Sequence, residues 1–123
     1  MFKGCNDLIS VKFEISEELY VNLESCFESC TKLETVYWGE GFYNKKMTHT
    51  FRGCDSLQTI NLTPINFSNS SALNGIFRDC DGLKNVTFGN IEKGSLNTTL
   101  FNAKCPKDCE IDLTNISKIT TYS

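Results

Sequence analysis

The chain has 123 residues and a formal net charge of −3, and its 40% hydrophobic and 22% charged residues are typical of one soluble globular domain. Twelve basic residues are scattered among fifteen acidic ones without a basic stripe, so we expect no nucleic-acid partner, whose phosphates would need neutralising. No apolar run approaches the roughly 18 residues of a membrane span, so we expect no membrane insertion.

The first predicted copy of a repeat, residues 1–14, introduces a pattern that recurs along the chain. Its apolar residues follow one another at intervals of three and then at an interval of two. The markers of the pattern are Phe2, Cys5, Leu8, Val11 and Phe13. This copy lacks the apolar stretch that precedes the phenylalanine in later copies. We therefore expect either a segment of a longer protein or a neighbouring chain that covers the first copy.

The pattern returns in the second to fourth predicted copies, residues 15–38, 39–62 and 63–88, as F-x-x-C-x-x-L-x-x-[VI]-x-[FLW]. The marker cysteines of the four copies lie 25, 24 and 26 residues apart, at Cys5, Cys30, Cys54 and Cys80. Ahead of each later cysteine the apolar residues recur at helical spacing, and after the leucine they alternate. We therefore predict a short helix, a turn and a short strand in each copy.

The fifth predicted copy, residues 89–113, is degraded. Phe101 and Cys105 stand one residue further apart than in the other copies, and Asp108 takes the place of the leucine. The alternating strand pattern then returns. We interpret this copy as a terminal, capping unit and residues 114–123 as a cap or tail, so that the chain forms a single domain.

Stacking of the copies is expected because a unit of about 25 residues has too little surface to bury its own apolar faces. The predicted fold class is an α/β repeat. It is a leucine-rich-repeat solenoid of about five coils, each with a short helix and a short strand, whose strands form one parallel β-ladder. One predicted core row is Phe2, Phe27, Phe51, Phe77 and Phe101. A second row holds the marker cysteines, and a third is Leu8, Leu33, Leu57 and Leu83.

The repeated F-x-x-C-x-x-L-x-x-[VI]-x-[FL] unit resembles the BspA-type leucine-rich repeats. The resemblance covers Met1 to about Leu113, four times in register with a fifth partial copy. Such repeats occur in surface proteins of bacteria and of some parasitic protists, where they are associated with adhesion. The resemblance therefore implies a binding platform for a protein or a glycan, and it transfers no catalytic residue.

The cysteine row has a second interpretation, as a metal or redox array. Cys26 with Cys30, and Cys105 with Cys109, have the spacing of two ligands on one helix face. A zinc site needs four ligands, however, and the only histidine, His49, belongs to another copy. Free cysteine is among the most buried residue types, so we predict core packing for the row, with no metal and no cofactor. No catalytic motif is present, and we do not expect an enzyme.

The outward positions of the predicted strands are the candidate binding site. If the valine and the last apolar residue of each strand point inward, the residues between them form exposed rows rich in threonine and asparagine. The candidate binding residues are Lys12, Thr35, Tyr37, Thr59, Asn61, Asn85, Thr87 and Asp112. This composition suits contact with a protein or a glycan, but a merely solvated sheet face has it as well.

Two functions are compatible with these features. The first is a non-catalytic adhesion or protein-interaction module of cell-surface type, which binds a host, cell-surface or same-assembly protein through the strand face. The second is a structural subunit of a virion or surface layer, packed end to end or laterally with its neighbours. No signal-peptide pattern is present. We expect a cell-surface or extracellular location if the chain belongs to a larger exported protein, and otherwise a cytoplasmic or virion-associated one.

Overall fold

The computed structural model describes residues 2–14, 19–39, 42–67, 73–89 and 109–112. The regular elements of these residues are strands, and no α-helix occurs among them. The strands are β1 (Ser10–Lys12), β2 (Leu19–Asn22), β3 (Thr35–Tyr37), β4 (Phe42–Lys46), β5 (Thr59–Leu62), β6 (Ile65–Phe67), β7 (Asn85–Phe88) and β8 (Glu110–Asp112).

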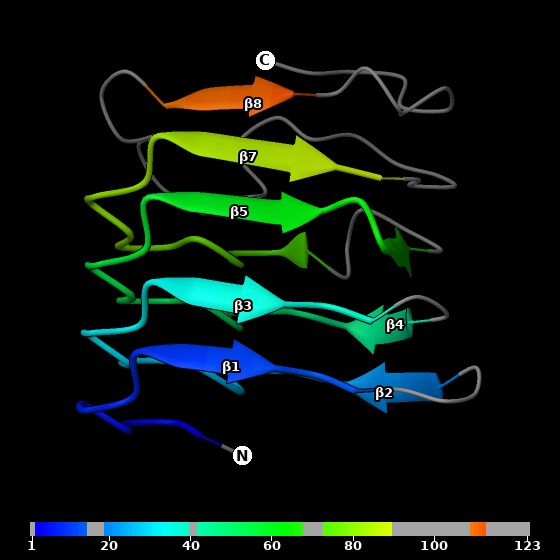
Figure 1. The fold of residues 1–123 in the computed structure, drawn as a ribbon, viewed down its shortest axis with the longest axis horizontal. Helices are drawn as coiled ribbons and strands as arrows, with labels where there is room; N and C mark the ends of the chain where they lie inside the picture. Colours follow the sequence, from blue (N-terminus) through cyan, green and yellow to red (C-terminus); the bar gives the residue numbers. More distant parts are fainter. Residues whose placement is uncertain (1, 15–18, 40–41, 68–72, 90–108, 113–123) are drawn as a thin grey trace.

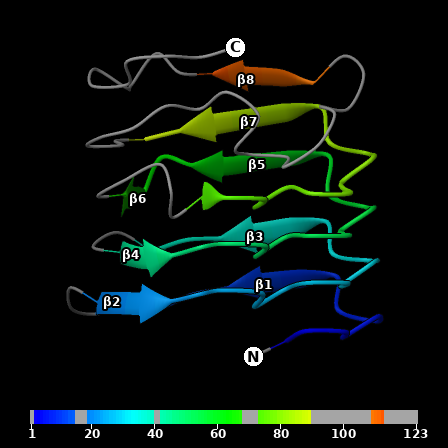
Figure 2. The ribbon, with the colours of Figure 1, turned by 180° about the vertical axis from the view of Figure 1, so that it is seen from behind.

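The strands form three small parallel sheets, with the orders β1-β3, β5-β7-β8 and β2-β4-β6. Neighbouring strands come from successive copies of the repeat, and equivalent residues face each other. Val11 pairs with Val36, and Val86 pairs with Ile60 on one side and with Ile111 on the other. Figures 1 and 2 show β1, β3, β5, β7 and β8 one above another, while β2 and β4 lie to one side and run in the opposite direction.

The predicted α/β leucine-rich-repeat solenoid is wrong. The described residues form strands and loops in place of helix-strand coils, and the strands are divided among small sheets instead of one parallel β-ladder. The expected helices are turns, and the segments that join each strand to the next pair of turns contain β2, β4 and β6. The ladder is interrupted because β3 does not pair with β5.

The segment expected to be helical ahead of each marker cysteine is a pair of β-turns. In the second copy, N–H to O bonds of 3.0 and 3.1 Å close the turns over residues 23–26 and 27–30. The third residues of these turns, Ser25 and Ser29, have φ angles of 55° and 63°, as in a type II turn. Two consecutive four-residue turns bring their first and last residues inward. This arrangement produces the i, i+3, i+4, i+7 spacing that is also typical of a helix.

The other copies repeat these turns, with positive φ at the same place. The residues concerned have φ between 57° and 74° and are Gly4, His49, Gly53, Gly75 and Asp79. The turns also direct N–H groups toward the next copy. Phe27 donates to the carbonyl oxygen of Thr50 at 2.9 Å, and Ser29 donates to that of Arg52 at 2.7 Å. An α-helix would use such N–H groups within its own segment, so bonds between copies replace the helical ones.

The core consists of rows of equivalent side chains. Phe27, Phe51 and Phe77 are fully buried, and the ring centroids of successive copies lie 5.6 and 5.9 Å apart. The marker leucines of the same copies are also buried. The predicted phenylalanine and leucine rows are therefore confirmed for the second to fourth copies. In the first copy, Phe2 and Leu8 are only half-buried.

Some predictions concern residues outside the described part of the chain. These are Phe101, Cys105, Asp108 and residues 114–123. Of the fifth predicted copy the structure describes Gly89 and residues 109–112, which include β8. The capping role of this copy and the division of the chain into copies within one domain therefore stay predictions.

Candidate binding surface

The strand face of β1, β3, β5, β7 and β8 carries all eight binding residues predicted from the sequence. Six of them are exposed: Lys12, Tyr37, Thr59, Asn61, Asn85 and Asp112. Thr35 and Thr87 are half-buried. The strand register pairs Lys12 with Tyr37, and Asn61 with Thr87. The eight residues thus lie on one face, in two groups that belong to separate sheets.

The two groups are divided between β3 and β5. Among the described strands, β3 pairs only with β1, and β5 pairs only with β7. Figure 1 shows β3 and β5 further apart than β1 and β3 or β5 and β7. Two open hollows of about 580 and 290 Å³ adjoin along this gap and share Thr35 and Thr59 as lining residues. We call the two hollows together the β3–β5 cleft.

The larger hollow is polar and lies at the amino ends of β3 and β5. It is lined by Glu34, Thr35, Asp55, Ser56, Gln58 and Thr59. Within the described residues, neither Glu34 nor Asp55 has a basic side chain within ion-pair distance. Lys32, two residues before Glu34, pairs with Asp7 at 3.1 Å. This end of the cleft therefore presents two carboxylates that no described cation neutralises.

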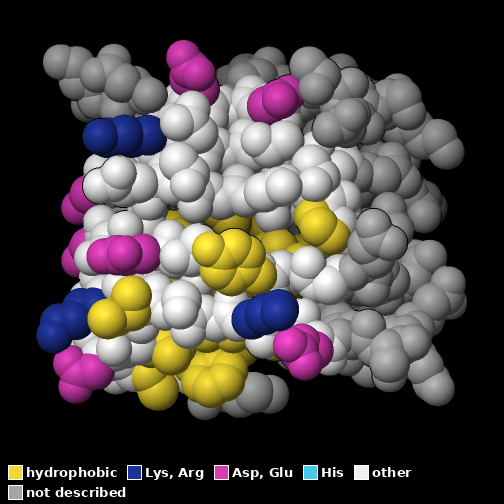
Figure 3. Space-filling view, in the orientation of Figure 1, with side chains coloured by type: hydrophobic (Ala, Val, Ile, Leu, Met, Phe, Trp, Pro, Cys, Tyr) yellow, Lys and Arg dark blue, Asp and Glu magenta, His cyan; other side chains and the backbone are white. Residues whose placement is uncertain are grey.

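The smaller hollow is more apolar and lies toward the carboxyl ends of the same strands. Besides the two shared threonines it is lined by Val36, Tyr37, Trp38, Ile60, Asn61 and Pro64. Tyr37 is 58% exposed. Trp38 is half-buried because its ring stacks on Phe13 at 5.1 Å and meets Phe51 edge-on at 6.3 Å. Figure 3 shows hydrophobic side chains reaching the surface over β3, whereas polar side chains cover the face over β7.

The second and third copies remain joined on the turn side, next to the marker cysteines. The thiol of Cys54 donates to the carbonyl oxygen of Phe27 at 3.1 Å, and the rings of Phe27 and Phe51 stack at 5.6 Å. The cleft is therefore an opening on the strand side alone. Trp38 borders it, and tryptophan is larger than the phenylalanine or leucine at this position in the other copies.

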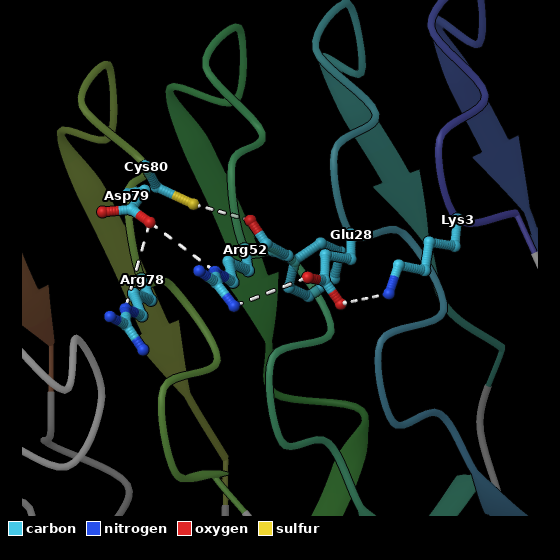
Figure 4. Close-up of polar contacts among 7 residues, drawn as sticks. Lys3, Glu28, Arg52, Arg78, Asp79 and Cys80 are labelled. Carbon is cyan, nitrogen blue, oxygen red and sulfur yellow. Dashed lines mark hydrogen bonds and ion pairs between the residues drawn. The ribbon is translucent and has the colours of Figure 1, made fainter.

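A row of charged side chains connects the copies on the turn side (Figure 4). Glu28 lies between Lys3 and Arg52, with N–O distances of 3.4 and 3.6 Å, and Arg52 also pairs with Asp79 at 3.6 Å. Burial alone would raise the pKa of Glu28. Hydrogen bonds from Ser25 and Lys3, with the charges of Lys3 and Arg52, outweigh burial and lower that pKa. The carboxylates of Glu28 and Asp79 are already neutralised by Lys3 and Arg52, so this row of charged side chains serves to join the copies.

The thiols of the marker cysteines donate hydrogen bonds to the preceding copy. The Sγ to O distances are 3.0, 3.1 and 2.8 Å for the pairs Cys30 to Phe2, Cys54 to Phe27 and Cys80 to Phe51. Burial raises the pKa of Cys54 far above its usual range and that of Cys80 to about 12, so both thiols stay protonated at neutral pH. Core packing is confirmed for Cys30, Cys54 and Cys80. It is wrong for Cys5, which is exposed because no described copy covers it.

The metal alternative has little geometric support in the described residues. No group of three or more histidine, cysteine, aspartate or glutamate side chains there could hold a metal ion. Cys26 and Cys30 end two consecutive turns and do not share a helix face. His49 is half-buried at the third position of a turn. The same part of the chain holds no helix of the length and hydropathy that crossing a membrane requires.

Sequence reasoning missed several residues that line the cleft. These are Glu34, Trp38, Asp55, Gln58 and Pro64. Trp38 was assigned to the core by strand alternation, and its contacts with two phenylalanine rings fit that assignment. Glu34, Asp55 and Gln58 precede the strands in segments without periodicity, which give no signal about their neighbours. The tryptophan at a position of smaller side chains was the one available sign that the second copy differs.

Comparisons with known proteins found no family model, no curated protein and no solved structure that matches this chain. The resemblance to BspA-type repeats, which rests on the repeated motif, therefore stays a prediction.

Proposed function

We propose that this protein is a non-catalytic interaction module that binds another protein through its strand face, with the β3–β5 cleft at the centre. The observation that carries the proposal is Tyr37, 58% exposed at the rim of a cleft that interrupts an otherwise polar sheet face. Tyrosine and tryptophan are enriched among the residues that dominate binding energy, especially where they border a pocket. The threonine and asparagine side chains around the cleft supply hydrogen-bonding groups.

The resemblance of the repeated motif to BspA-type repeats supports the same function. Proteins with those repeats are associated with adhesion at cell surfaces, and a partner exposed on a host cell, on a neighbouring cell or in the same assembly fits that role. The support comes from the F-x-x-C-x-x-L motif and does not depend on the expected helices. A glycan is a second ligand class for the same face.

The proposal is tested with the double variant Tyr37→Ala and Asn61→Ala. Both side chains are exposed and lie outside the core, so the variant is expected to keep the circular dichroism spectrum of the parent and to lose little stability, chiefly through the hydrogen bond that Asn61 Oδ1 accepts from the Thr63 N–H at 3.0 Å. We expect capture of cell-surface proteins on the immobilised chain to fall at least tenfold, read by quantitative mass spectrometry. Asn74→Ala, at an exposed turn position away from the strands, is the matched control. Equal capture by the parent and the double variant would exclude the strand face as the binding site.

An assembly role is the second candidate, and an apolar patch on the first copy favours it. Ile9 is 55% exposed, and Phe2 and Leu8 are only half-buried. β1 has no described strand on the side away from β3. Light scattering over a range of concentrations, with Ile9→Lys as the variant, tests this candidate. A parent that associates and an Ile9→Lys chain that does not would favour it, whereas a monomeric parent at millimolar concentration would exclude association through this edge.

A further inference from the structure

The two ends of the β3–β5 cleft differ in chemistry, and this difference indicates what kind of ligand fits. We infer that the cleft binds an extended peptide segment that carries a basic side chain and an aromatic or large apolar one. The two side chains are two residues apart along the peptide, in either order. This inference rests on the proposed function, because it names the chemistry of the partner at the same face.

The polar end selects a cation. Glu34 and Asp55 line it from successive copies, both are exposed, and neither has a basic partner among the described residues. The lysine nearest in sequence, Lys32, already pairs with Asp7. An ammonium or guanidinium group placed there would meet carboxylates from both sides, together with the side-chain oxygens of Thr35 and Gln58.

The apolar end accepts a large side chain. Tyr37, Trp38 and Pro64 border it, and Ile60 and Val36 form part of its lining with exposures of 5% and 8%. The Trp38 ring is fixed between two phenylalanine rings, so it is available as a rigid wall without ordering on binding. An aromatic or branched side chain placed against this wall would remove apolar surface from water.

The separation of the two ends matches an extended chain. Residues 34 and 35 line the polar end and residues 36–38 the apolar end, so the cleft follows the direction of β3. At about 3.3 Å per residue, the stretch from residue 34 to residue 38 spans roughly 13 Å. Two side chains on the same face of an extended peptide, two residues apart, are separated by about 6.6 Å and fit within that length. Among the described strands, β3 and β5 do not pair with each other, which leaves the cleft open along the direction of β3.

A peptide fits the cleft better than a glycan for an electrostatic reason. Glu34 and Asp55, which have no basic partner among the described residues, gain most from a cation, which basic side chains supply and neutral sugars do not. Acidic sugars would be repelled, and the chain as a whole has a net charge of −3. A glycan ligand is therefore the competing outcome that the experiment must separate.

The test uses three probes with the isotopically labelled full chain in nuclear magnetic resonance titrations. The first probe is the peptide acetyl-Ser-Arg-Ser-Trp-Ser-amide, the second has glutamate in place of arginine, and the third is the trimer of N-acetylglucosamine. We expect the arginine peptide to bind at least fivefold more tightly than the glutamate peptide and to shift amide signals of residues 34–38 and 55–61. Equal binding of the two peptides, shifts elsewhere, or cleft binding by the sugar alone would overturn the inference.

Variants assign the two ends of the cleft. Glu34→Gln with Asp55→Asn removes both exposed charges and is expected to weaken binding of the arginine peptide about fivefold, since two exposed ion pairs together contribute about 1 kcal/mol. Glu110→Gln, an exposed carboxylate on the same face outside the cleft, is the matched control and should leave binding unchanged. If Glu110→Gln weakens binding of the arginine peptide as much as the double variant does, the effect is one of overall charge, and the assignment of the cation to the polar end of the cleft is wrong.

The two proposals can fail separately. If Tyr37→Ala with Asn61→Ala abolishes capture of a protein partner while the arginine peptide does not bind, the strand face is the binding site and the ligand chemistry inferred here is wrong. If the arginine peptide binds the cleft while the double variant captures protein partners as well as the parent does, the inferred ligand chemistry is supported and the proposed function is wrong.

Discussion

The thiols of Cys54 and Cys80 make the stability of this protein sensitive to alkaline pH. Burial raises the pKa of Cys80 from its ordinary 9.0 to about 12, and burial raises that of Cys54 as well. The raised pKa means that the folded state keeps its thiol protonated while the unfolded state ionises. The contribution of these buried thiols to stability is therefore complete below about pH 9 and is lost as the pH rises toward 12. For Cys80 the loss is on the order of 2 kcal/mol between pH 9 and 11.

The assay is urea unfolding, followed by circular dichroism under reducing conditions, at pH 8, 9, 10 and 11. The parent is compared with Cys54→Ala plus Cys80→Ala, so that the titration of tyrosines and lysines cancels in the difference. We expect the double variant to be less stable than the parent at pH 8, because it leaves cavities and removes two thiol donors. We also expect its stability to fall less steeply with pH. Parallel stability curves for the two proteins between pH 9 and 11 would refute the conclusion that the buried thiols stay protonated in the folded state.

Three further variants test the packing between copies by urea unfolding at neutral pH. Phe51→Ala should lower the free energy of unfolding by about 3–5 kcal/mol, because the ring is fully buried between two others; a loss below 1 kcal/mol would contradict the stacked row. Gly89→Ala should cost about 1–3 kcal/mol, since a Cβ there would clash with the carbonyl oxygen of Thr63; an unchanged midpoint would contradict this close approach. Glu28→Gln should cost about 1 kcal/mol at pH 7. The lowered pKa of Glu28 means that ionised Glu28 stabilises the fold above its usual pKa and loses this effect in acid, so the cost should shrink toward pH 3.

The core rows and the strand face could be predicted because they depend on spacing along the chain. Phe27, Phe51 and Phe77 occupy the same place in copies of nearly equal length, so they stack whatever the local structure of each copy is. Val36 and Tyr37 illustrate the strand rule: alternation placed the valine inside and the tyrosine outside, and their exposures are 8% and 58%. These outcomes required only a period and an alternation.

The helices could not be distinguished from turns by periodicity. Leu23, Cys26, Phe27 and Cys30 have helical spacing, but two successive four-residue turns produce the same spacing. The residues at the third turn positions carried the information that would have decided between them. Gly4, Gly53 and Gly75 recur there, and glycine inside a helix costs about 1 kcal/mol, whereas it adopts positive φ without strain. Serine, histidine and aspartate at the equivalent positions of other turns obscured that signal.

The cleft was beyond sequence reasoning because it depends on how two copies sit against each other. Thr35, Tyr37, Thr59 and Asn61 were predicted as face residues, and all four line it. Nothing in the motif distinguishes the junction between the second and third copies from the other junctions. The absence of pairing between β3 and β5 is a tertiary feature, and it converts four scattered face residues into the rim of one site.

A strictly regular stack would carry no such site. If every copy paired with the next, the five strands would form one sheet, and the outward rows would be solvated threonine and asparagine side chains with only one aromatic residue among them. In this protein the turn side and the phenylalanine row keep the second and third copies joined, while the strand side opens beside Trp38. The binding chemistry lies at that interruption. The thiol and phenylalanine contacts that join the copies do not involve the exposed cleft residues Glu34, Tyr37, Asp55 and Asn61, so these four can change to suit a partner without loss of the stack.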